Sequence, residues 1–76
     1  MKLRDLAIGT RAVVTGYAAG DLAYRGKLLA MGLTRGVAVT VIKVAPLGDP
    51  VKIEVRGYEL SLRKAEADAV EVEESR

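Results

Sequence analysis

The side chains that could do chemistry in this sequence are mostly carboxylates, because its 76 residues include neither cysteine nor histidine. This composition excludes disulfides, thiolate nucleophiles, zinc fingers and Ser–His or Cys–His catalytic arrangements. Outside the acidic C-terminal segment, the candidate ligands are Asp21, Asp49, Glu54 and Glu59. Isolated carboxylates favour hard cations and bind them weakly unless several converge. We therefore expect no catalytic residues, no cofactor and no metal site, with at most a weak, unspecific association with a divalent cation.

Charge and aromatic content narrow the class of partner. Residues 1–64 carry eleven Lys and Arg against five acidic residues, which suits an acidic protein, an anionic membrane surface or nucleic acid. Unevenly placed but solvated surface charge is the alternative. Nucleic-acid modules use several aromatic platforms, whereas this chain has only Tyr17, Tyr24 and Tyr58, the last on the inward register of its expected strand. No phosphate-binding glycine motif is present, so we expect no nucleotide or other small-molecule substrate.

Short strands must position these residues. Apolar and polar residues alternate over 51–55 and over 58–62, and Arg56–Gly57 lies between them as a hairpin turn. Strands in so short a chain predict a small bent barrel that hides its edges, a mainly β architecture. The expected elements are strands at about 11–16, 37–44, 51–55, 58–62 and 70–72, one short helix at about 22–31 with Asp21 as its N-cap, and a single helical turn at about 64–69.

The expected helix carries apolar residues on two sides. Leu22 and Leu29 fall on one side, and Tyr24, Leu28 and Met31 fall on the other. One stripe must pack on the barrel. The other either packs as well or stays partly exposed for a partner.

Glycine and proline punctuate a helix-to-strand turn and a hairpin. Gly32 lies where a left-handed helix cap is favoured, and the prolines restrict the backbone of the hairpin. We expect Asp49 to accept a hydrogen bond from a backbone N–H within that hairpin turn. The residues expected to be structural in these two turns are Gly32, Gly36, Pro46, Gly48, Asp49 and Pro50.

Three segments together resemble the FeoA family. Residues 24–36, YRGKLLAMGLTRG, are similar to its helix-and-turn signature, and residues 44–51, VAPLGDPV, resemble its hairpin. Residues 60–64, LSLRK, match its L-x-L-R strand end. The resemblance covers about residues 3–73 in the family's order and spacing.

The resemblance implies that the five expected strands form an SH3-like barrel over residues 1–73, and the polar residues 74–76 predict a frayed tail. It further implies a cytoplasmic, non-enzymatic accessory protein of bacterial ferrous iron uptake. Such a protein would dock on the cytosolic part of FeoB, a membrane transporter with a GTP-binding domain, and would be peripheral to the membrane at most. The alternatives are a nucleic-acid-binding barrel and a metal-sensing domain like the C-terminal domain of iron-dependent repressors.

The candidate docking surface combines the expected helix with the hairpin tip, which we expect to lie near each other. Arg63 is expected either to form a surface ion pair or to contact a carboxylate of the partner. The candidate partner-binding residues are Tyr24, Arg25, Leu28, Met31, Leu47 and Arg63. Whether the chain self-associates is not decided by the sequence.

Overall fold

The elements of the chain follow the order expected from the sequence. The computed structural model describes residues 1–18 and 22–75. The elements are η1 (Leu3–Asp5), β1 (Arg11–Tyr17), α1 (Leu22–Ala30), β2 (Ala38–Val44), β3 (Val51–Val55), β4 (Tyr58–Leu62), α2 (Lys64–Asp68) and β5 (Val70–Glu74). The mainly β prediction with one short helix and a further helical turn is confirmed. The N-cap expected at Asp21 lies outside the described residues.

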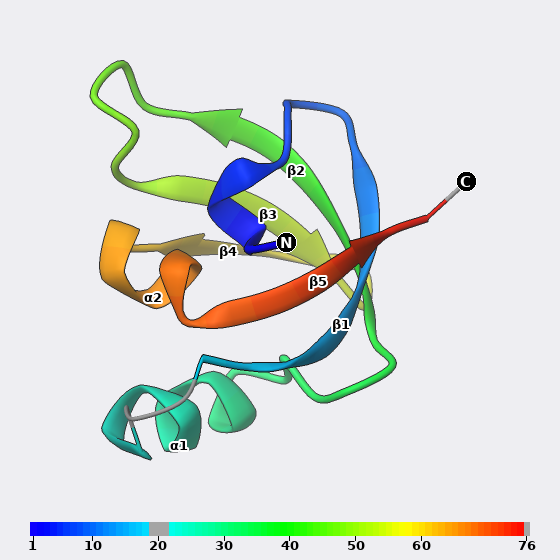
Figure 1. Ribbon diagram of the computed structural model, residues 1–76. Helices are drawn as coiled ribbons and strands as arrows, with labels where there is room; N and C mark the ends of the chain where they lie inside the picture. Colours follow the sequence, from blue (N-terminus) through cyan, green and yellow to red (C-terminus); the bar gives the residue numbers. More distant parts are fainter. Residues whose placement is uncertain (19–21, 76) are drawn as a thin grey trace.

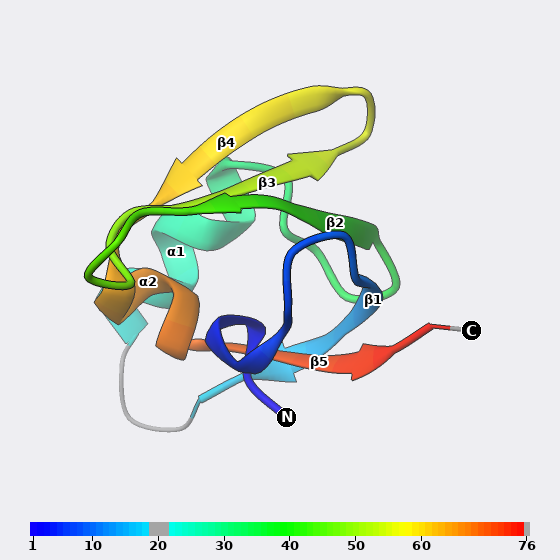
Figure 2. The ribbon, with the colours of Figure 1, turned by 90° about the horizontal axis from the view of Figure 1, so that it is seen from above.

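One antiparallel sheet with strand order β4-β3-β2-β1-β5 wraps around the core. Figures 1 and 2 show how strongly it bends, with α2 between the ends of β4 and β5. The N-terminal segment runs beside β5, where the Val72 amide donates to the Met1 carbonyl oxygen at 2.8 Å. Strand β4 is the outermost strand at the other edge of the sheet.

The core follows from the alternation seen in the sequence. Val51, Ile53 and Val55 of β3 are buried, while Glu54 between them is exposed. The inner faces of the other strands and the leucines of η1, α1 and the following turn complete one cluster. Its large, fully buried side chains are Leu3, Leu28, Leu33, Ile53, Leu62, Val14, Val39, Val41, Val51, Val55 and Val70.

Helix α1 ends as predicted, on a left-handed glycine. Gly32 has φ +91°, and the Leu33 amide donates back to the Leu28 carbonyl oxygen at 3.0 Å. This bond closes the last turn and directs the buried Leu28 and Leu33 side chains into the same core. The tail expected to fray at residue 74 is paired further than predicted. Glu74 ends β5, and the Ser75 amide donates to the Arg11 carbonyl oxygen at 2.8 Å.

Candidate functional site

The helix stripe that we expected to meet a partner is the one that packs on the barrel. Leu28 is fully buried, and Tyr24 and Met31 are partly buried against the core. Leu29, from the opposite stripe, is 41% exposed. Leu28 is therefore removed from the candidate surface. Periodicity placed Leu28 and Leu29 on different sides, as observed, and the Leu28 carbonyl oxygen accepts the capping bond from the Leu33 amide.

Two tyrosines fasten the helix region to the sheet. The Tyr17 hydroxyl donates to the Leu33 carbonyl oxygen at 2.5 Å, and the Tyr58 hydroxyl donates to the Met31 carbonyl oxygen at 2.5 Å. The Arg25 guanidinium carbon lies 5.7 Å from the centre of the Tyr17 ring, within range of a cation–π interaction. Tyr58 was expected to be buried but is 40% exposed, because it begins the edge strand beside the helix end. These contacts lie within the chain and stabilise its fold.

An ion pair between the exposed Lys27 and the buried Glu66 joins the two helices, and the sequence analysis missed it. The Lys27 ammonium nitrogen of α1 lies 2.5 Å from Glu66 Oε2 of α2, while the Arg63 amide donates to Glu66 Oε1 at 2.8 Å. The hydrogen bond from Lys27 lowers the pKa of Glu66 below its ordinary value of 4.5, although burial opposes this shift. One signal in the sequence could have indicated the role of Glu66. It follows Arg63, the residue before α2, by three positions, which is the spacing of a capping box.

In contrast to the buried Leu28 of α1, the apolar tip of the β2–β3 hairpin points into solvent. Leu47 is 93% exposed. The turn beneath it is closed by its own backbone: the Gly48 amide donates to the Ala45 carbonyl oxygen at 2.7 Å, and the Ala45 amide donates to the Pro50 carbonyl oxygen at 3.1 Å. Gly48 adopts φ +81°, as its predicted turn role requires. The tip is thus formed without any help from the Leu47 side chain.

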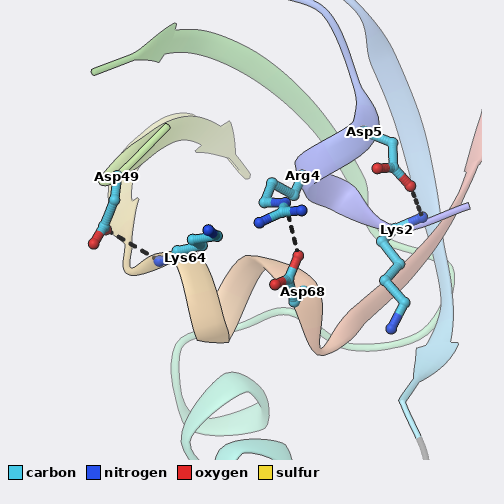
Figure 3. A network of polar contacts seen from close by, with 6 residues as sticks. All are labelled: Lys2, Arg4, Asp5, Asp49, Lys64 and Asp68. Atoms are coloured by element: carbon cyan, nitrogen blue, oxygen red, sulfur yellow. Dashed lines mark hydrogen bonds and ion pairs between the residues drawn. The ribbon is translucent and has the colours of Figure 1, made fainter. Parts of the chain in front are cut away.

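Asp49 ties this hairpin to α2. Its Oδ1 accepts a hydrogen bond from the Lys64 amide at 3.1 Å, as Figure 3 shows, and its Oδ2 lies 3.2 Å from Arg63 Nη2. The expectation of a bond within its own turn is wrong, because α2 begins beside the hairpin and offers an unpaired first-turn amide. Of the two roles considered for Arg63, the surface ion pair is present.

The six candidate partner-binding residues do not form one surface. Figure 1 shows the β2–β3 hairpin and α1 on opposite sides of the molecule, with the sheet and α2 between them. Leu47 and Arg63 therefore belong to a hairpin region, while Tyr24, Arg25, Leu28 and Met31 belong to an α1 region. The expected proximity of Leu47 to the helix is wrong, because the sheet bends between them.

The acidic side chains are the candidate metal ligands of this chain, which has no cysteine or histidine. Within residues 1–18 and 22–75, no three of them gather where they could hold a metal ion. None of the helices in this part of the chain is long and apolar enough to cross a membrane.

Comparison with known proteins shows what the barrel is. The FeoA domain profile matches residues 1–74. The chain belongs to the FeoA domain family. The Fe(2+) transport protein A/Fe(2+) transporter FeoB fusion protein of Porphyromonas gingivalis is 38% identical over 73 residues, covering 96% of this chain and 8% of that protein. The chain thus spans less than a tenth of that relative.

Solved FeoA structures have the same fold. A FeoA-like protein from Clostridium acetobutylicum superposes with a TM-score of 0.89 at 36% identity, covering 97% of this chain and 85% of that one. Stenotrophomonas maltophilia FeoA in complex with zinc, described as an SH3 domain protein, has a TM-score of 0.81 at 29% identity, covering 96% and 89% of the two chains. The SH3-like prediction is confirmed.

Proposed function

We propose that this chain is a non-enzymatic accessory module of ferrous iron uptake that docks on the cytosolic part of a FeoB-type transporter. The observation that carries the proposal is the P. gingivalis fusion, in which a domain 38% identical to this chain shares one polypeptide with FeoB. A covalent link keeps two modules at high local concentration. The fusion therefore supports a FeoA domain that works in contact with FeoB.

The chemistry of the described residues supports docking over catalysis. Their buried ionic group, Glu66, is occupied by Lys27 and the Arg63 amide. The side chain left most open among the large apolar residues, Leu47, belongs to a hairpin tip with no reactive group. Such an arrangement can recognise the surface of another protein. We propose that the protein lies in the cytoplasm, at the inner face of the membrane through its partner.

The rival functions have less support from these contacts. A nucleic-acid-binding barrel needs accessible aromatic rings for stacking, but the Tyr17 ring is beside Arg25 and the Tyr58 hydroxyl is bound to Met31. A metal-sensing domain needs converging ligands, and three acidic groups do not converge within residues 1–18 and 22–75.

The test is binding to full-length FeoB of the source organism, held in nanodiscs, together with complementation of iron uptake. We expect the purified chain to bind these nanodiscs. We also expect its expression to restore ferrous iron uptake in a strain from which its gene has been deleted. Failure to bind FeoB would contradict docking. Retarded migration of RNA or DNA at low salt, lost at high salt, would favour the nucleic-acid alternative instead.

A further inference from the structure

We propose that Leu47 is the anchor of the interface, inserting into an apolar pocket rimmed by carboxylates on the partner protein. This inference rests on the proposed function for the identity of the partner, the cytosolic part of the FeoB-type protein. It adds which surface binds and what chemistry receives it.

The first argument is the combination of exposure and order at the tip. Leu47 is 93% exposed, more than Ile8 at 61% or Leu29 at 41%. Turn residues at such a position are ordinarily polar or small, and leucine gains nothing for folding there. The two backbone bonds across the turn and the contacts of Asp49 with α2 hold the tip in place.

Order of this kind favours binding. A side chain on a turn already closed in the free protein loses less conformational entropy when it enters a pocket. A few residues that fill desolvated pockets near the centre of a protein interface carry most of its binding energy. The hairpin therefore holds Leu47 in an ordered position before a partner binds.

The second argument is charge, which indicates the rim of the pocket. Lys43 and Lys52 are direct cross-strand partners at the base of the hairpin, on the face away from the core. Like charges in this position repel each other. Lys52 Nζ is 2.9 Å from Glu59 Oε1, whereas no ion pair joins Lys43 to a carboxylate of the described residues. An acidic rim would relieve this repulsion, and it would steer the encounter.

A lipid surface fits these features less well. Stable attachment to a membrane takes two signals, such as two acyl chains or one acyl chain with a polybasic cluster. A single leucine is weaker than even one of these signals. Arg63 and Lys52 also already have carboxylate neighbours within this chain. A pocket on a protein needs only the single anchor and the modest charge found here.

The experiment compares five proteins for binding to FeoB in nanodiscs: wild type, Leu47→Asp, Lys43→Glu, and the matched controls Ile8→Asp and Leu29→Asp. The three aspartate variants place a carboxylate on an exposed apolar position, and equal thermal midpoints verify that all variants fold. We expect Leu47→Asp to weaken binding by about tenfold or more. We expect the two controls to change it by less than about twofold. Lys43→Glu should slow association, with an effect that shrinks as salt is raised.

The outcomes separate the two proposals. If wild type binds FeoB and Leu47→Asp binds equally well, the anchor assignment is wrong while docking on FeoB stands. If Leu29→Asp alone weakens binding, the α1 region is the interface and the anchor assignment is again wrong. Equal binding of wild type to empty anionic nanodiscs would make lipid the occupant and overturn the pocket. Absence of any binding by wild type would overturn the proposed docking and the anchor with it.

Discussion

The α1 region and the hairpin region each contain a leucine from a segment that resembles the FeoA pattern, with opposite results. Leu28 is completely buried, whereas Leu47 is 93% exposed. The Leu28 carbonyl oxygen accepts the capping bond that turns the chain inward, and Leu47 lies in the middle of a turn closed by its own backbone. Backbone closure therefore decides whether an apolar side chain builds the core or remains available. The α1 region stabilises the barrel, whereas the Leu47 side chain can vary without disturbing it.

The sharpest test of this contrast truncates the two leucines. Leu28→Ala should lower the free energy of unfolding by about 3 kcal/mol, since it leaves a cavity in the core. Leu47→Ala should change it by no more than about 0.5 kcal/mol, because the side chain is in solvent. Chemical denaturation of both variants measures the difference. Similar losses in the two variants would break the comparison.

The next largest effect concerns the bond between the two helices. Glu66→Ala should lower the free energy of unfolding by about 2 kcal/mol at neutral pH, because the buried contacts to Lys27 and the Arg63 amide are lost. Lys27→Ala is the matched control on α1. Its effect should be smaller, since the Lys27 side chain is 59% exposed and the Arg63 amide still binds Glu66.

The same pair predicts a pH dependence. The pKa of Glu66 is lowered on folding, so its stabilising charge is fully present above the ordinary value of 4.5 and is lost as pH falls through the folded pKa. The stability gap between wild type and Glu66→Gln should therefore be constant near neutral pH and narrow below about pH 4.5. Denaturation series at several pH values measure this gap. A gap that persists unchanged into acid would mean that the charge does not stabilise the fold.

A smaller effect is expected where α1 ends. Gly32→Ala should lower the free energy of unfolding by about 1.5 kcal/mol, because φ of +91° strains alanine and a Cβ there would collide with the Tyr58 hydroxyl. In a Tyr58→Phe background the same change should be less harmful, since the colliding hydroxyl is gone. Equal losses in both backgrounds would show that backbone strain alone is responsible.

The smallest effect concerns the base of the hairpin. Asp49→Ala should lower the free energy of unfolding by about 1 kcal/mol, because the Lys64 amide loses its acceptor. Asp49→Asn keeps an acceptor and loses only the exposed ion pair with Arg63, so it should cost about 0.3 kcal/mol. Thermal or chemical unfolding of the two variants distinguishes them. If Asp49→Asn is as unstable as Asp49→Ala, the charge of Asp49 and not its hydrogen bond to the Lys64 amide stabilises the contact with α2.

Local signals in the sequence were sufficient for the elements of the fold. Alternation over residues 51–55 and 58–62 located β3 and β4, and the turn between them has Arg56 and Gly57 at φ 51° and 82° as a tight hairpin requires. Gly32 located the end of α1. Each of these features is determined by residues close together in the chain.

The features that the sequence did not reveal all depend on contacts between distant segments. Asp49 binds an amide fifteen residues away, and the Tyr58 hydroxyl reaches a carbonyl twenty-seven residues away. The separation of Leu47 from α1 follows from the bend of the sheet, which no local pattern encodes. For the same reason, the candidate docking residues could be proposed individually but not assembled into a surface.

The exposure of Leu47 has a practical consequence. The chain has no cysteine, so Leu47→Cys would introduce its sole thiol at a site where a fluorophore or photo-crosslinker stands clear of the barrel. A reporter attached there would register the arrival of a binding protein directly, and its spectrum in the unbound molecule would be that of a dye in water.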